Sequence, residues 1–292
     1  MTQLQVNQFS HGLLNPGIGC LMSCLGSFLG LRCLTRARVC AGRAHATWVL
    51  VASVAIGGTG IWVTHVVAVL GYTIPGQEIL YNVPMTVISL GVAISVVATG
   101  LFIADLGRSS LGQVLAGGMV MGTGIAAMHY FGMAALSIHG TVRYDLRLVG
   151  ISILIAIVTC AAAIAAGLRG RGVWSSLGVS VVMGVAITGM HYTGMSAMRI
   201  YAGGDALVRP GEPVNSLLLP LLLGASVVTF VLMLIVAISA NEDEIVADAG
   251  LTERLKAGAS LVVREAEGIR EPELTMLDVI EIPERDAFGT AI

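Results

Sequence analysis

The sequence predicts an all-α membrane protein: a multi-pass bundle of about seven transmembrane helices, built from three tandem two-helix repeats. Two observations carry this prediction, the composition and the recurrence of one histidine motif. Of the 292 residues, 55% are hydrophobic and only 12% are charged, which is about half the charged fraction of soluble domains. Windows of roughly 20 mostly apolar residues, the length of a spanning helix, recur from Pro16 to Ala240. The lipid bilayer is therefore the expected surrounding of the chain.

Arginine, proline and glycine bound the apolar runs and divide the chain into elements. The predicted spans are residues 17–31, 48–72, 84–106, 111–137, 148–168, 173–200 and 216–240. Residues 1–16 are expected to form an extracytoplasmic N-terminus, residues 17–240 the membrane domain, and residues 241–292 a cytoplasmic tail. That tail holds 13 of the 18 acidic residues and five basic ones, so we expect it to be acidic and disordered.

The distribution of arginine predicts the orientation, because positively charged short loops stay in the cytoplasm. One set of alternating loops holds seven arginines and the other four, which favours an outside N-terminus and a cytoplasmic C-terminus in the cell membrane. The two sets are Arg32, Arg36, Arg38, Arg43, Arg108, Arg169 and Arg171, and Arg143, Arg147, Arg199 and Arg209. These arginines lie at helix ends and form no continuous basic stripe, so no nucleic-acid partner is expected.

One histidine motif occurs three times and predicts the internal symmetry. The copies are Gly57-Gly-Thr-Gly-Ile-Trp-Val-Thr-His65, Met121-Gly-Thr-Gly-Ile-Ala-Ala-Met-His129 and Met183-Gly-Val-Ala-Ile-Thr-Gly-Met-His191. Their histidines are 64 and then 62 residues apart, a distance that accommodates two spans with their loops. Three helix pairs in tandem follow, with the histidine-bearing helices running in the same direction.

The three histidines are predicted to lie at one depth. His65, His129 and His191 are 17, 18 and 18 residues beyond the predicted starts of their spans, or roughly 26 Å along a helix, near the non-cytoplasmic face. Ionisable residues within a span are costly and usually face the bundle interior, so the trio predicts a shared site. The alternative is three core histidines bonded to carbonyls or hydroxyls, since repetition can also preserve packing.

Methionines beside the histidines suggest the kind of site. Met133 and Met195 each follow a histidine by four residues and so share its helix face. Imidazole and thioether together suit copper, because the soft thioether favours Cu(I). Met128 and Met190 lie about 100° round the helix from the adjacent histidine; packing is the favoured interpretation for them and metal binding the alternative.

The segments Met190-His191-Tyr192-Thr193 and Met128-His129-Tyr130-Phe131 resemble the MHYT family of bacterial membrane sensor domains, as does Tyr81-Asn-Val-Pro-Met-Thr86. The resemblance covers about residues 11–240. It implies a metal, copper above all, near the outer face, and sensing of O2, CO or NO. The first copy departs from the pattern, with Thr64-His65-Val66 and Val69 in place of both methionines. Carried over residue by residue, the implied ligands are His129, Met133, His191 and Met195, and, with weaker matches, His65, Met128 and Met190.

The leading hypothesis is a non-enzymatic sensor in which these ligands hold an ion that binds a diatomic gas. A copper or cation transporter and a structural, partner-binding membrane protein with a degenerate site are the alternatives. No nucleophile–base pair, phosphate loop or carboxylate dyad is present in the sequence, so no catalysis is expected. Family members are often fused to nucleotide-cyclase-type or phosphodiesterase domains, for which residues 241–292 are too few. A cytoplasmic or membrane signalling partner, or the acidic tail, is then expected to relay the signal.

Overall fold

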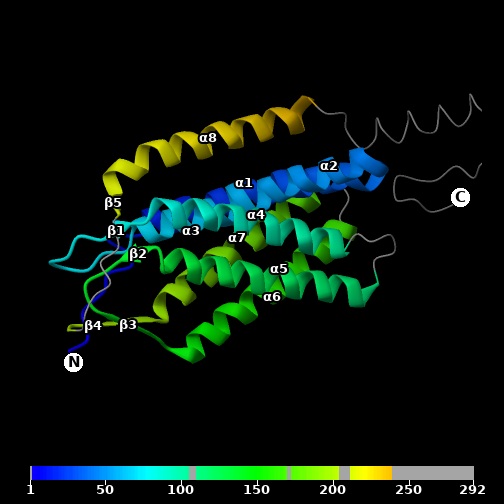
Figure 1. The fold of residues 1–292 in the computed structure, drawn as a ribbon. Coiled ribbons are helices and arrows are strands. Elements are labelled where there is room, and N and C mark those ends of the chain that lie inside the picture. Colours follow the sequence, from blue (N-terminus) through cyan, green and yellow to red (C-terminus); the bar gives the residue numbers. More distant parts are fainter. Residues whose placement is uncertain (1, 105–109, 170–171, 204–210, 239–292) are drawn as a thin grey trace, which may run out of the picture. The chain divides into compact units, whose positions relative to one another are not determined.

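The protein is mostly helical, and its helices lie alongside one another in a bundle in the computed structural model (Figure 1). The structure describes residues 2–104, 110–169, 172–203 and 211–238. The predicted tail, residues 241–292, therefore lies outside the described residues. The helices are α1 (Leu14–Val39), α2 (Gly42–Ser53), η1 (Val54–Trp62), α3 (Val63–Leu70), α4 (Val83–Ala104), α5 (Leu111–Met133), α6 (Leu146–Arg169), α7 (Val173–Ser196) and α8 (Val214–Ile238).

Six helices are long and apolar enough to cross a membrane: α1, the continuous helix formed by α2, η1 and α3, and α4 to α7. The protein is thus a multi-pass membrane protein. The seventh helix, α8, contains Pro220, and among the described residues its apolar stretch, Leu223–Ile238, is shorter than a span. The seventh span therefore remains a prediction.

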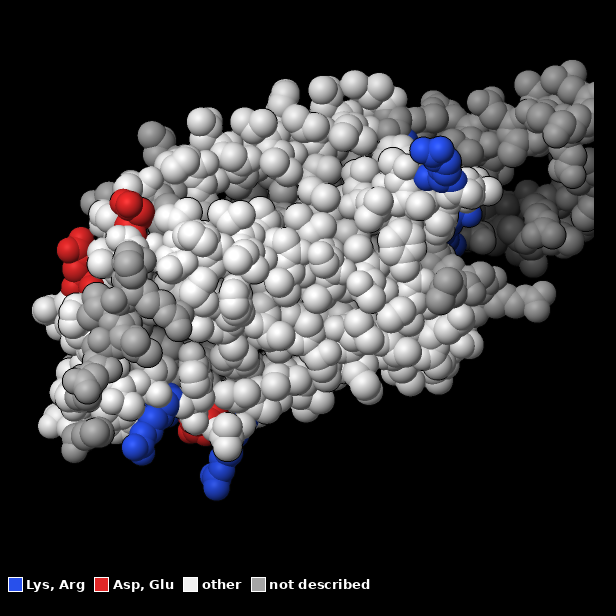
Figure 2. All heavy atoms as spheres, viewed as in Figure 1, with Lys and Arg blue, Asp and Glu red and all other residues white. Residues whose placement is uncertain are grey.

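Charged residues lie at the two ends of the bundle. Figure 2 shows a broad region of the visible face without Lys, Arg, Asp or Glu, bounded at both ends by charged side chains. Large apolar side chains such as Leu154, Val182 and Phe230 are more than half exposed. Exposed apolar residues between charged ends are what lipid contact requires.

The all-α prediction is incomplete, because five short strands lie at one end of the bundle, which we call the strand end. They form a three-stranded sheet of order β2-β1-β5 and a pair, β3-β4. The predicted spans 111–137 and 173–200 were too long for the same reason: helices α5 and α7 end at Met133 and Ser196, and the following backbone groups pair between strands instead. The strands are β1 (Leu80–Tyr81), β2 (Leu136–Ser137), β3 (Thr141–Tyr144), β4 (Met198–Tyr201) and β5 (Glu212–Pro213).

The first span is longer than predicted, because arginine does not end it. Arg32 and Arg36 are only 8% and 4% exposed within α1. The Arg36 guanidinium lies 5.2 Å from the centre of the Trp48 ring and donates a hydrogen bond of 3.2 Å to the Val236 carbonyl of α8. Contacts with an aromatic face and a helix carbonyl let this cation lie inside the bundle.

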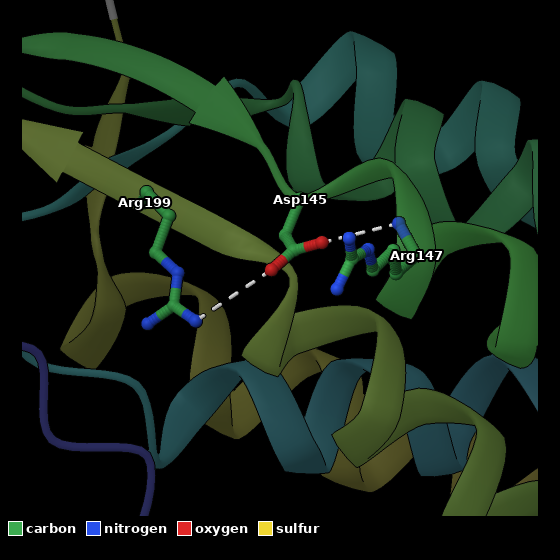
Figure 3. A network of polar contacts seen from close by, with 3 residues as sticks. All are labelled: Asp145, Arg147 and Arg199. Atoms are coloured by element: carbon green, nitrogen blue, oxygen red, sulfur yellow. Dashed lines mark hydrogen bonds and ion pairs between the residues drawn. The ribbon is translucent and has the colours of Figure 1, made fainter.

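Asp145 links the two paired strands at the strand end to the start of α6. Its carboxylate accepts a 3.1 Å hydrogen bond from the Arg147 backbone N–H and lies 3.9 Å from the Arg199 guanidinium of β4 (Figure 3). The first contact caps α6, which begins at Leu146. Both side chains of the ion pair are more than a third exposed, so the pair adds little stability.

The helix formed by α2, η1 and α3, which we call the second helix, is the most enclosed element of the bundle. Its most apolar part is 83% buried, compared with 28% to 50% for the other five spans. The N-terminal segment crosses the strand end, where the Leu4 N–H bonds the Ile200 carbonyl and the Asn7 N–H bonds that of Thr73.

Candidate metal centre

The three motif histidines meet in the interior of the bundle. His65 comes from α3, His129 from α5 and His191 from α7. Their ring centroids are 5.0 to 5.3 Å apart, and one ring nitrogen from each lies within 4.8 Å of the others. The first is 3% exposed and the other two are 0% exposed. The predicted convergence of alternate parallel helices on one point is therefore confirmed.

The Nδ1 of His129 lies close to the Nδ1 atoms of both other rings. The His129 Nδ1 is 3.1 Å from that of His65 and 3.2 Å from that of His191. The His191 Nε2 lies 3.2 Å from the Ile61 carbonyl oxygen, which only accepts hydrogen bonds. His191 therefore carries its proton on Nε2, and the lone pair of its Nδ1 faces the centre.

That tautomer leaves the centre without a complete set of hydrogen bonds. A ring nitrogen has either one proton or one lone pair in the ring plane. If the His129 Nδ1 donates to His191, it has no lone pair left for His65. The trio by itself can thus satisfy only one of its two Nδ1 contacts, and the His129 Nε2 is buried without a partner among the described residues.

A metal ion fits this set of donors. Tetrahedral ligands at 2.0–2.1 Å from an ion lie about 3.4 Å apart, close to the observed 3.1 and 3.2 Å. An ion can accept all three Nδ1 lone pairs at once. The described residues contribute no Asp, Glu or Cys to this cluster, which disfavours a hard ion such as magnesium.

Each histidine ring contacts the next copy of the repeat. A Cβ added to Gly132 would collide with the His65 Nε2, and one added to Gly194 would collide with the His129 Nε2. Both glycines follow a motif histidine by three residues. The third ring, that of His191, contacts the first copy through a hydrogen bond to the Ile61 carbonyl. The three copies therefore form a closed ring of contacts.

The Ile61 carbonyl belongs to a π-helical segment, η1. There the Val63 N–H donates to the Gly58 carbonyl, five residues earlier, whereas an α-helix uses the fourth. The glycine-rich sequence Gly57-Gly-Thr-Gly60 lies in this segment. Such π turns are frequent at functional sites, and this one contains the carbonyl that orients His191.

Two layers of side chains enclose the histidine layer. Toward the strand end, four residues after each histidine, lie Val69, Met133 and Met195, all buried in one cluster. Away from it, four residues before each histidine, lie Ile61, Ile125 and Ile187, buried in the main core. Met133 and Met195 thus lie where the sequence predicts them, next to the histidine layer; whether they bind an ion stays a prediction.

The other two predicted methionines are placed differently. Met128 and Met190 are 0% and 1% exposed and lie in the main core among apolar side chains. This placement agrees with packing, the favoured interpretation, while their role as ligands is untested.

A cap of buried apolar side chains, among them Tyr72, Tyr81, Leu136 and Ile200, covers the centre at the strand end. The Tyr81 hydroxyl donates a 3.3 Å hydrogen bond to the Val69 carbonyl. The segment that begins at Tyr81 therefore contacts the layer that Val69 forms with Met133 and Met195. Burial raises the pKa of the Tyr81 phenol, which therefore stays neutral at physiological pH. The cap separates the three histidines from the solvent at that end.

Sequence reasoning missed what surrounds the outward-facing Nε2 atoms. Gly132 contacts the ring of His65 and Gly194 that of His129, in each case the histidine of the preceding copy, and these contacts require coordinates. A signal was available, since both stand three residues after a histidine. The Ile61 carbonyl had no such signal, because a backbone acceptor leaves no mark in the sequence.

Comparison with known proteins gives a family match over most of the bundle. The family model MHYT, described as a bacterial signalling protein N-terminal repeat, matches residues 58–118, 122–180 and 184–255. The chain is 35% identical over 188 residues to the bifunctional diguanylate cyclase/cyclic di-GMP phosphodiesterase MucR of Pseudomonas aeruginosa, covering 63% of this chain and 27% of that protein. It is 30% identical over 206 residues to an uncharacterized signaling protein of Caulobacter vibrioides, covering 70% of this chain and 25% of that protein.

A third relative is the cyclic di-GMP phosphodiesterase NbdA of Pseudomonas aeruginosa, 38% identical over 147 residues, which cover 48% of this chain and 19% of that protein. The chain thus spans about a quarter of the length of these relatives. No solved structure matches it.

Proposed function

The chain belongs to the MHYT family of bacterial signalling proteins, and on that basis we propose that it is a membrane sensor whose three histidines hold a copper ion. A bound copper ion would supply a coordination position for O2, CO or NO. His65, His129 and His191 act as ligands through Nδ1, and Met133 and Met195 add thioethers from the strand-end side.

The observation that carries this proposal is the direction of the Nδ1 lone pairs. The Ile61 carbonyl keeps the proton of His191 on Nε2, so the lone pair of its Nδ1 faces the buried Nδ1 of His129, which also faces that of His65. Hydrogen bonds among three histidines cannot satisfy that geometry, whereas a cation can. Burial of all three rings makes an unfilled polar cluster costly.

Copper is preferred over zinc because of the methionines. Zinc also accepts three histidines, but a thioether is a poor ligand for it and a good one for Cu(I). Met133 and Met195 are buried in the layer adjoining the histidines, which supports the softer ion. Histidine and methionine ligands alone would let the ion bind a small molecule. A sensor needs only such binding, with no nucleophile or general base.

The signal would pass along the helices that hold the ligands. Binding of a gas would shift α3, α5 and α7 relative to one another and change the population of two bundle states. With the strand end outside, as the distribution of arginine favours, the opposite ends of these helices face the cytoplasm. A signalling partner there, or residues 241–292, would receive the change.

Metal analysis of the purified protein tests this proposal. We expect about one copper ion per chain, with an EPR signal after oxidation, and loss of both in a His129→Ala, His191→Ala double variant. His139→Ala is the matched control, because this exposed histidine lies at the strand end outside the trio. Equal copper in the double variant and the wild type would overturn the assignment.

A further inference from the structure

A long apolar slot lies between the second helix, α4 and α8. Its volume is about 430 Å³, within the range of pockets that enclose small ligands. Along the second helix the slot extends from Val54 to Leu70, roughly 20 Å of helix. Tyr81 and Val83 border it at the strand end. The slot is long enough for one extended hydrocarbon chain, since a bilayer core of about 30 Å holds two chains end to end.

The polar side-chain atoms of the lining are bonded within the protein. Only four lining side chains carry such an atom, and none is charged. The Trp62 Nε1–H donates a 2.9 Å hydrogen bond to the Ser89 hydroxyl, and the Tyr81 hydroxyl donates to a backbone carbonyl. The hydroxyls of Thr59 and Thr86 donate to the carbonyls four residues earlier. The slot thus has no side-chain partner for a polar guest, and water needs two to four partners.

The slot opens onto the surface that faces the lipid. Val87 of α4 and Val228 of α8 line it, and their side chains are 60% and 41% exposed. The exposed apolar side chains of Ile88 and Leu223 continue the same surface beside them. A guest can therefore enter sideways from the bilayer, whose molecules carry hydrocarbon chains in abundance.

One wall of the slot is the π-helical segment η1. Gly58, Thr59 and Trp62 line the slot, whereas the carbonyl of Ile61, in the same segment, bonds His191. A guest in the slot would therefore contact the segment that orients one histidine of the centre.

We infer that one acyl chain of a membrane lipid, from the leaflet at the strand end, occupies this slot and packs against η1. Three features support this occupant: the length of the slot, a lining without free polar side-chain atoms, and an opening toward the hydrocarbon of the bilayer. Hydrocarbon fills such a space with favourable dispersion contacts. The inference does not depend on the metal centre.

Quenching of tryptophan fluorescence by lipids with brominated acyl chains tests the inference. The chain has three tryptophans, and replacing Trp48 and Trp174 by Phe leaves Trp62, which lines the slot and is only 8% exposed. In vesicles of brominated phosphatidylcholine we expect Trp62 to be strongly quenched. Gly224→Leu adds a side chain to the slot where a new Cβ meets nothing within 4 Å, and it should reduce this quenching by at least half.

Gly150→Leu is the matched control for that variant. It makes the same substitution in α6, where an added Cβ also meets nothing within 4 Å, and it should leave the quenching of Trp62 at the wild-type level. Val228→Phe enlarges another lining side chain and should act like Gly224→Leu, so it decides the matter if Gly224→Leu does not fold. Slot variants quenched as strongly as Gly150→Leu would overturn the inference, as would an unquenched Trp62.

Native mass spectrometry of the protein released from detergent identifies the occupant. We expect one retained phospholipid per chain, with several-fold lower occupancy in Gly224→Leu than in the wild type or Gly150→Leu. A quinone or a free fatty acid in its place would overturn the assignment to a lipid acyl chain. Neither experiment uses copper, so the proposed function and this inference can fail independently.

Discussion

The first copy of the repeat differs from the second and third, and the structure gives a physical reason for two of the differences. Where the later copies have Met128 and Met190, the first has Thr64. Its hydroxyl lies 2.7 Å from the Gly19 carbonyl of α1 and 2.6 Å from the Gly60 carbonyl, so it can join the second helix to α1. The later copies place apolar methionines in the core instead.

The glycine three residues after the histidine shows the same contrast. Gly132 and Gly194 leave space for the rings of His65 and His129, but the corresponding residue in the first copy is Ala68. The ring that would pack there, His191, bonds the π-helical carbonyl of Ile61 instead. The first copy therefore closes the ring of three by a hydrogen bond instead of by close packing.

The largest expected effect follows from filling one of these glycine positions. Gly194→Ala places a methyl group against the His129 Nε2 and forces the ring away from the centre. We expect a loss of about 1–3 kcal/mol in stability, as for overpacked cores, together with loss of copper. Thermal unfolding in detergent and metal analysis measure both quantities.

Gly189→Ala is the matched control on the same helix, because an added Cβ there meets nothing within 4 Å. The close-packing explanation would be abandoned if both alanine variants retained copper and unfolded at the same temperature.

A smaller effect is expected from the methionines, and it separates ligands from packing. Met133→Leu with Met195→Leu keeps the side-chain volume while removing both thioethers. We expect Cu(I) affinity to fall about tenfold and stability to change by less than about 1.5 kcal/mol. Competition titration with a Cu(I) chelator provides the affinity.

The corresponding control is Met128→Leu with Met190→Leu, which changes the core methionines. It should leave Cu(I) affinity unchanged. If the control pair lowered Cu(I) affinity and the strand-end pair did not, the thioether ligands would be Met128 and Met190 rather than Met133 and Met195.

The smallest effect concerns Thr64, which distinguishes the first copy. Thr64→Val removes the hydroxyl that bonds the Gly19 and Gly60 carbonyls. Leaving these buried acceptors with one fewer partner is expected to lower stability by about 1 kcal/mol, while Thr64→Ser, which keeps the hydroxyl, should lose less. Unfolding measured by tryptophan fluorescence in detergent compares them, and a Thr64→Val protein as stable as the wild type would remove the proposed role of this hydroxyl.

Much of this architecture could be predicted because membrane helices and repeats leave periodic signals. The spacing of His65, His129 and His191 was sufficient to predict parallel helices and a common depth. The ends of α5 and α7 were not predictable to within a few residues, since Leu136 and Met198 are apolar and continue the hydrophobic run while their backbones pair in strands. Hydropathy reports burial from water and does not distinguish a buried strand from a further helical turn.

The sequence by itself determined the membrane environment, the three-fold repetition and the meeting of the histidines at one level, because these depend on composition and on spacing along the chain. Tertiary structure alone decided which ring nitrogens face the centre, which glycines receive the rings and that the Ile61 carbonyl orients His191. Those features depend on contacts between residues that are 62 to 130 positions apart. Ring rotation and backbone hydrogen bonds are set only when the helices pack.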